Sequence, residues 1–152
     1  MFRGFNPINL DEKGRLAVPT RYRAELRDCC EQQMVLTASP ERCLLLYPLP
    51  EWEEIERKIS KLPSLNKKTK LLQRVLIGHA TECEMDGQGR VLIAEPLRRF
   101  AGLEKRVVLV GQGIKFEIWD EDVWNRNLDE SLEEHGLDDL TDLSPELGNL
   151  SF

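Results

Sequence analysis

The chain has 152 residues, of which 41% are hydrophobic, 32% charged and 7% aromatic, and its formal net charge is −6 at pH 7. This composition provides enough apolar side chains for a core and excludes collagen-like, disordered and disulfide-scaffold proteins. The longest mainly apolar stretch, residues 71–80, is far shorter than the ~20 residues of a membrane span, and residues 1–6 lack the apolar core of a secretory signal. We therefore expect a cytoplasmic protein with no membrane partner.

Charge is distributed unevenly along the chain. Residues 120–152 contain eleven acidic residues and one basic residue, a net charge of −10, whereas residues 1–119 have a net charge of +4. The first 27 residues contain six basic and three acidic side chains. A basic body permits a nucleic-acid partner despite the acidic total. Taken alone, however, the cationic run is explained about as well by a solvated face.

The first part of the chain predicts a strand, a tight turn, a second strand and a short helix. The turn lies within residues 9–18, Asn-Leu-Asp-Glu-Lys-Gly-Arg-Leu-Ala-Val, and Pro19 suits the first turn of the helix. Two apolar runs of strand length follow at residues 34–37 and 43–47. A helix is predicted over residues 50–62.

Residues 61–78 are predicted to form a helical linker. Pro63 and Ser64 predict a break in secondary structure, and Asn66 suits the position that caps the N-terminus of the following helix. The side chains that form an apolar helix face are Leu71, Leu72, Val75 and Leu76.

The turn pattern recurs in residues 84–93, Glu-Met-Asp-Gly-Gln-Gly-Arg-Val-Leu-Ile, at an offset of 75. A short cationic segment, residues 96–99, follows this copy as it follows the first. Further on, apolar runs at residues 107–110 and 114–119 predict strands, Gly111-Gln112-Gly113 predicts the hairpin turn between them, and residues 120–134 predict a helix. The aligned pairs are Asp11 with Asp86, Gly14 with Gly89, and Arg15 with Arg90.

Two copies are too few for a solenoid, and each has too few strands to bury its own faces. We therefore expect a mainly β fold with short helices (α+β), in which two pseudo-symmetric halves interlock into a barrel-like core. The halves are residues 1–60 and 79–125, joined by the linker over residues 61–78. An acidic C-terminal helix and tail follow over residues 126–152.

The repeated turn has a chemistry suited to DNA. Glycine at Gly14 and Gly89 permits a positive φ, and the carboxylates of Asp11 and Asp86 can accept hydrogen bonds from backbone N–H groups of the turn. An arginine on such a rigid base can form a bidentate contact with O6 and N7 of guanine, worth ~1–3 kcal/mol of discrimination. The alternative is that the aspartate and arginine simply pair within a hairpin.

Arg15 is therefore the predicted base reader, within a DNA-binding loop that includes Gly14. Cations near it are expected to contact phosphates, which adds affinity but little sequence information. Gln88 stands where the first copy has Lys13, so the second loop, with Arg90, is electrostatically weaker. The predicted phosphate contacts are Lys13, Arg3, Arg21 and Arg23.

Five segments of the chain are similar to motifs of the MraZ family of transcriptional regulators: residues 2–4, 10–23, 43–52, 78–80 and 85–90. The resemblance extends from residue 1 to about residue 125. It implies a cytoplasmic, nucleoid-associated protein with two SpoVT-AbrB-like halves, each with a D-x-x-x-R motif, here Asp11 with Arg15 and Asp86 with Arg90. It also implies ring-shaped homo-oligomers that bind G-rich direct repeats in double-stranded DNA. The implied target is the promoter of the division and cell-wall gene cluster, so that the ring represses that cluster and its own gene.

Two other classes of function are alternatives to DNA binding. An enzyme would need a nucleophile with its base, but Cys83 and His79 have no third orienting group, and no Cys or His spacing matches a zinc site. We therefore expect no catalytic residue, metal, cofactor or small-molecule substrate. The second alternative is an AbrB-fold scaffold or antitoxin-like module that mainly binds another protein, for which Trp52 and Trp124 would provide apolar contacts.

Overall fold

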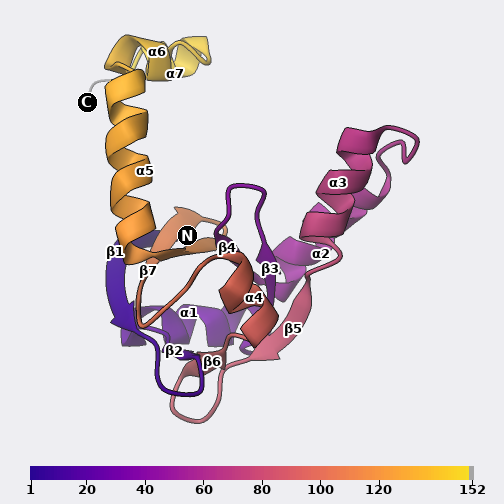
Figure 1. Ribbon diagram of the computed structural model, residues 1–152, viewed down its shortest axis with the longest axis vertical. Coiled ribbons are helices and arrows are strands. Elements are labelled where there is room, and N and C mark those ends of the chain that lie inside the picture. Colours follow the sequence, from indigo (N-terminus) through magenta and orange to yellow (C-terminus); the bar gives the residue numbers. More distant parts are fainter. Residues whose placement is uncertain (151–152) are drawn as a thin grey trace. The chain divides into compact units, whose positions relative to one another are not determined.

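The strands of the two repeat copies combine in one six-stranded antiparallel sheet in the computed structural model, which describes residues 1–150 (Figure 1). The first copy supplies β1 (Phe2–Asn9), β3 (Gln33–Ala38) and β4 (Leu44–Pro48), and the second supplies β5 (Thr81–Glu84), β7 (Arg106–Gly113) and β8 (Phe116–Asp120). Their order is β1-β7-β8-β4-β3-β5, so the hairpin of each copy lies between strands of the other. The expected α+β fold of interlocked halves is confirmed.

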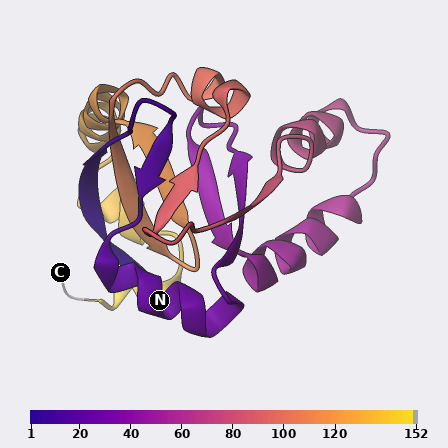
Figure 2. The same ribbon diagram turned by 90° about the horizontal axis from the view of Figure 1, so that it is seen from below.

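A separate two-stranded ribbon joins the repeated turns. It consists of β2 (Arg15–Ala17) and β6 (Arg90–Leu92), which run antiparallel and side by side (Figure 2). Two flanking hydrogen bonds extend the pairing: the Val18 N–H donates to the Gly89 carbonyl at 2.9 Å, and the Ile93 N–H donates to the Gly14 carbonyl at 3.0 Å. Val18 is equivalent to Ile93 in the repeat, and Gly89 is equivalent to Gly14, so each bond is the counterpart of the other. The ribbon therefore has a local pseudo-twofold symmetry.

Four helices accompany the sheet and ribbon. They are α1 (Thr20–Cys30), α2 (Leu49–Ser60), α3 (Lys67–Leu76) and α4 (Glu95–Phe100). In α1 the buried residues Tyr22 and Leu26 are four positions apart, which is the spacing that puts side chains on one helix face. The α2 and α3 helices are joined by a hydrogen bond from Gln73 Nε2 to the Ile59 carbonyl at 3.1 Å. The predicted cap of α3 is confirmed, because the Asn66 side chain accepts the Lys68 N–H at 2.8 Å. Figure 1 shows both helices.

The core is filled by apolar side chains from both copies. Leu16 and Val91 of the ribbon are buried, as are strand residues such as Leu36, Leu46, Leu109 and Ile118. An aromatic group joins the sheet to α1: the ring centroid of Phe116 lies 4.4 Å from that of Phe2 and 4.9 Å from that of Tyr22. Burial of this apolar surface from both copies provides the main driving force for their interlocking.

The hairpin between β7 and β8 is present, but its turn lies slightly later than the predicted Gly111-Gln112-Gly113. The Gln112 N–H donates to the Lys115 carbonyl at 2.9 Å, and Gly113 has a φ of 86°. Gly111 instead pairs with Gly4 inside the sheet. A Cβ atom at Gly111 would lie 2.6 Å from the Arg3 nitrogen, so this glycine allows a close approach of two strands.

The chain divides into two compact units, residues 1–121 and 122–152. The predicted helix near residue 120 is α5 (Glu121–Glu134), and α6 (Leu137–Thr141) and α7 (Pro145–Gly148) follow it. None of the described residues in these three helices is buried. The last two residues of the predicted tail, 151–152, lie outside the described residues. Over residues 1–150, no helix is both long and apolar enough to span a membrane.

Candidate nucleic-acid interface

The first turn is closed by hydrogen bonds to Asp11. Its Oδ1 accepts the backbone N–H groups of Lys13 at 3.0 Å and Arg15 at 2.8 Å, while its carbonyl accepts the Gly14 N–H at 3.0 Å. The Asp11 N–H donates to the Arg15 carbonyl at 3.1 Å. Gly14 has a φ of 82°, a conformation that other residues adopt only with strain. The loop is therefore fixed by local bonds and projects Arg15 from a rigid base.

The second turn repeats this geometry. Asp86 Oδ1 accepts the N–H groups of Gln88 and Arg90, both at 2.9 Å, and Gly89 has a φ of 75°. The Gly89 N–H donates to the Asp86 carbonyl at 3.0 Å, and the Asp86 N–H donates to the Arg90 carbonyl at 2.9 Å. The second turn therefore has the same backbone geometry as the first, although it has Gln88 at the position of Lys13.

Each turn arginine is paired with the aspartate of its own turn. The Nε atom of Arg15 lies 2.6 Å from Asp11 Oδ2, and that of Arg90 lies 2.8 Å from Asp86 Oδ2. Both arginine side chains are 28% exposed. The pair engages the Nε edge of the guanidinium, and its terminal nitrogens carry further N–H donors. Ion pairing and base reading are therefore compatible.

Both arginines lie on the same face of the ribbon. In the antiparallel register Arg15 stands opposite Leu92 and Ala17 opposite Arg90, while Leu16 and Val91 point into the core. Residues directly opposite in a sheet share a face, and diagonal neighbours are within reach of long side chains. Accordingly, Arg90 Nη1 lies 3.9 Å from Asp11 Oδ2. The structure therefore joins two motifs that are 75 residues apart in the sequence.

The turn carboxylates are held in their ionised form. The N–H of Arg15, followed by the other bonds of the turn, lowers the pKa of Asp11 below its ordinary value of 3.8. The N–H of Arg90 does the same for the pKa of Asp86. Both aspartates are consequently charged at neutral pH and can orient their arginines.

The other predicted DNA contacts fall into two places. Lys13 has an exposed side chain at the tip of the first turn. Arg3 and Arg21 are also exposed, and both are joined to the Tyr22 hydroxyl, which accepts from Arg21 Nη2 at 2.9 Å and donates to the Arg3 carbonyl at 2.6 Å. Arg21 Nη2 also donates to Asn6 Oδ1. The Arg21 guanidinium is thus held at the junction of β1 and α1, and the backbone of Arg3 is fixed there, away from the hydrogen bonds of the turns.

Arg23, the remaining predicted phosphate contact, is half-buried and donates from Nε to the Val18 carbonyl at 2.8 Å. Its equivalent in the second copy is Arg98, which donates from Nη1 to the Lys13 carbonyl at 3.0 Å. The sequence predicted only a cationic segment at this point. Extending the repeat alignment by eight residues beyond Arg15 and Arg90 would have singled out Arg98.

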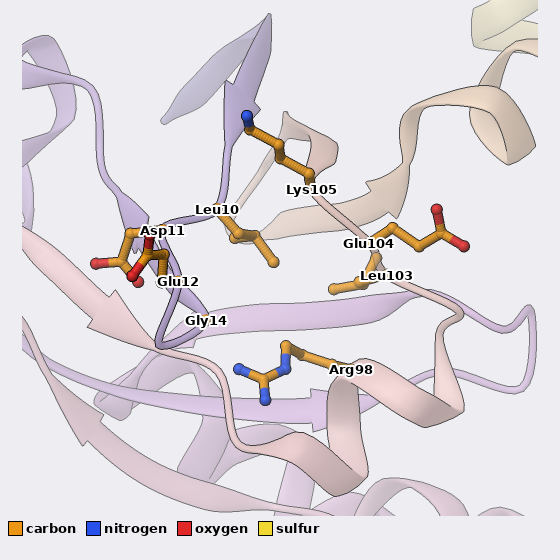
Figure 3. Close-up of a pocket in the computed structure, with 8 residues that line it drawn as sticks. All are labelled: Leu10, Asp11, Glu12, Gly14, Arg98, Leu103, Glu104 and Lys105. Carbon is orange, nitrogen blue, oxygen red and sulfur yellow. The ribbon is translucent and has the colours of Figure 1, made fainter.

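Arg98 lines a pocket of about 410 Å³ beside the first turn (Figure 3). Its charged lining is mixed, with Arg98 and Lys105 against three carboxylates, so it has no strong preference for a simple anion or cation. Within the described part of the chain, no three His, Cys, Asp or Glu side chains are grouped as metal ligands. The lining residues are Leu10, Asp11, Glu12, Gly14, Arg98, Leu103, Glu104 and Lys105.

Comparison with known proteins identifies the repeat independently. The family model described as "MraZ protein, putative antitoxin-like" matches residues 1–75 and again residues 76–142, so that each match contains one Asp-x-x-Gly-Arg turn. The chain is 66% identical over 152 residues to the transcriptional regulator MraZ of Methylococcus capsulatus and 53% identical over 152 residues to that of Thioalkalivibrio sulfidiphilus. It is 54% identical over 153 residues to that of Escherichia coli strain K12. Each alignment covers 100% of both chains.

Proposed function

Because this chain belongs to the MraZ family of transcriptional regulators, we propose that the exposed face of its β2–β6 ribbon reads base edges in double-stranded DNA. The observation that carries the proposal is the placement of Arg15 and Arg90, each fixed by its own aspartate, on one face of a two-stranded ribbon. A ribbon of this kind fits the major groove of B-DNA, where arginine can bind guanine through two hydrogen bonds.

The residues have distinct roles in this proposal. Arg15 is the main base reader and Arg90 is the second, with Asp11 and Asp86 holding their guanidinium groups. Gly14 and Gly89 allow the backbone of each turn to close. Lys13, Arg3 and Arg21 are exposed cations that contact phosphates and so add affinity without sequence information.

The proposed target is a set of G-rich direct repeats in the promoter of the division and cell-wall gene cluster that contains the protein's own gene, and the outcome is repression. We further propose that the chain assembles into a ring and acts in the cytoplasm at the nucleoid. Such a ring would reconcile DNA binding with the net charge of −6, because several subunits that engage regularly spaced repeats multiply weak individual contacts. In this arrangement residues 1–60 and 79–125 are the two symmetry units of one core, residues 61–78 connect them, and residues 126–152 form an acidic appendage.

The family name and the exposed apolar side chains of α3 favour a second candidate, a scaffold that binds another protein. Leu71 on this helix is 62% exposed, and Leu65 just before it is 94% exposed. A transcriptional regulator belongs to no class of enzyme, and neither candidate requires a catalytic group or cofactor.

The test measures binding to a duplex that contains the upstream region of the protein's own gene and to a shuffled duplex, across a salt series. We compare the unaltered chain with Arg15→Ala, Arg90→Ala and the control Arg57→Ala, which removes an exposed arginine of α2. Arg15→Ala removes the proposed bidentate guanine contact, so its affinity for the specific duplex is expected to be about 5- to 150-fold lower than that of the unaltered chain. The size of the oligomer is expected to stay the same.

Equal binding of both duplexes by the unaltered chain would refute promoter recognition and favour the scaffold. Specific binding that survives in Arg15→Ala and Arg90→Ala as it does in Arg57→Ala would refute the ribbon as the reading surface.

A further inference from the structure

We propose that Arg23 and Arg98 are positioning residues, each of which holds the turn of the opposite repeat copy in the geometry that presents its arginine. The effect on DNA rests on the function proposed above, whereas the effect on the turns does not. This role of Arg23 differs from the phosphate contact expected from the sequence, and the sequence predicted no individual role for Arg98.

Arg98 occupies the space that Gly14 leaves open. A Cβ atom at Gly14 would lie 1.4 Å from Arg98 Nη1 and 2.6 Å from its Cζ, so the guanidinium group lies directly against the turn. The same Nη1 donates to the Lys13 carbonyl at 3.0 Å. Figure 3 shows the Arg98 side chain extending from α4 toward this turn. Arg98 is anchored by its neighbour Leu97, which is buried, so the bond ties the first turn to the core of the second copy.

Arg23 stands in the corresponding place at the second turn. A Cβ atom at Gly89 would lie 2.2 Å from Arg23 Nε and 2.4 Å from its Cζ. Its Nε donates to the Val18 carbonyl, while the Val18 N–H donates to the Gly89 carbonyl at 2.9 Å. Arg23 follows the buried Tyr22 on α1, so a residue of the first copy supports the turn of the second.

These contacts favour positioning over phosphate binding. Both guanidinium groups already donate to backbone carbonyls, and both side chains are half-buried. Arg98 also lines a pocket whose other charged residues include three acidic ones, Asp11, Glu12 and Glu104, an environment unfavourable for a phosphate. By contrast, Lys13 and Arg3 are exposed in the way a phosphate contact requires.

The contacts of Arg98 with the first turn and of Arg23 with the second give a further reason for glycine at Gly14 and Gly89. Positive φ alone would favour glycine, asparagine or aspartate. An added Cβ at Gly14 or Gly89 would in addition force the Arg98 or Arg23 side chain to move away from the turn, so glycine is the residue that preserves these contacts. Each arginine therefore acts on the opposite turn through the one site where no side chain intervenes.

The first test needs no DNA and follows hydrogen exchange of the turn amides in the full chain. Arg98→Ala is expected to accelerate exchange at Gly14 and Arg15 roughly tenfold, the loss expected for a charged hydrogen bond, while Gly89 and Arg90 keep their rates. Arg23→Ala is expected to give the converse pattern. The control for Arg98 is Arg99→Ala, because Arg99 is exposed and pairs with Glu95 on its own helix. The control for Arg23 is Arg27→Ala, an exposed arginine of α1.

The crosswise pattern separates positioning from general loss of stability, which would accelerate exchange at both turns together. Equal acceleration at both turns, or acceleration only at the turn of the substituted copy, would overturn the proposal.

The second test adds DNA. Positioning predicts that Arg98→Ala weakens binding to the upstream duplex, leaves binding to the shuffled duplex and its salt dependence unchanged, and has no added effect in an Arg15→Ala background. A phosphate contact predicts weaker binding to both duplexes and a salt slope smaller by about 0.9, and that result would overturn the proposal. If the unaltered chain shows no specific binding, the proposed function fails, and the exchange measurement still decides whether the arginines hold the turns.

Discussion

Leu16 pairs with Val91, the residue that occupies the same place in the second copy of the repeat. A pair of equivalent residues at the centre of the ribbon requires that the two copies meet about a local twofold axis. Each three-residue strand thereby covers the edge of the other, and both central side chains enter the core. The two turns are consequently placed at opposite ends of one ribbon with their arginines on a common face.

Gly14→Ala is expected to destabilise the protein by at least about 1 kcal/mol. The left-handed backbone alone costs about 1–2 kcal/mol for alanine, and the added Cβ must also displace the Arg98 guanidinium. The free energy of unfolding from urea denaturation measures the effect. Gly87→Ala is the control, since nothing lies within 4 Å of its Cβ position, and it should change stability by less than about 0.5 kcal/mol. Equal stability of the two variants would contradict the close approach at Gly14.

Tyr22→Phe is expected to cost about 1–3 kcal/mol, because the buried hydroxyl donates to the Arg3 carbonyl and accepts from Asn6 and Arg21. Thermal and urea denaturation test this. Tyr47→Phe is the matched control, since Tyr47 is equally buried and its hydroxyl makes no protein hydrogen bond among residues 1–150. An equal or larger loss in Tyr47→Phe would contradict a stabilising contribution from the hydroxyl network of Tyr22.

Thr37→Val is expected to destabilise the attachment of α3 to the sheet. The fully buried Thr37 Oγ1 donates to the Leu76 carbonyl at 2.5 Å, and valine would leave that carbonyl without its donor at a cost of about 1–3 kcal/mol. Thr81→Val provides the comparison, because the Thr81 hydroxyl bond to the His79 carbonyl is exposed to water. Denaturation curves that coincide for the two variants would contradict the prediction.

Acid is expected to loosen both turns. Because folding lowers the pKa of Asp11 and Asp86, their contribution to stability is present above the pKa of the unfolded chain and is lost as the pH falls through the lowered, folded value. Carboxyl chemical shifts measured by NMR should therefore give both aspartates pKa values below 3.8. Titration of either group at or above that value would mean that the turn bonds do not stabilise the charged form.

Gln88→Lys is expected to strengthen DNA binding by giving the second turn the cation that Lys13 gives the first. One additional phosphate contact should steepen the salt slope by about 0.9 and increase affinity for specific and shuffled duplexes alike. Gln112→Lys, an exposed position in the β7–β8 hairpin, controls for the added charge alone. An unchanged slope in Gln88→Lys would indicate that the second turn does not approach the phosphates.

The internal hydrogen bonds of each turn follow from residues three or four positions apart, and so does the cap of α3 by Asn66. Aspartate, glycine and asparagine at these spacings can make the bonds whatever the remainder of the chain does, which is why sequence reasoning anticipated them. The sequence placed Gly111 in the hairpin turn, whereas the structure places it inside the sheet beside β1. Glycine suits both a turn and a close approach of two strands, and which of the two applies here depends on β1, more than a hundred residues away in the chain.

The sequence by itself therefore determined the elements, the repeat, the family and the local form of the two turns. Tertiary structure alone decided that Leu16 meets Val91, that Arg15 and Arg90 share a face, and that Arg23 and Arg98 lie against the glycines of the opposite turns. These partners are distant in the chain, and they are selected by how the apolar faces of both copies pack and by the register that this packing imposes. A pattern read along one copy carries no information about which atoms of the other copy will lie against it.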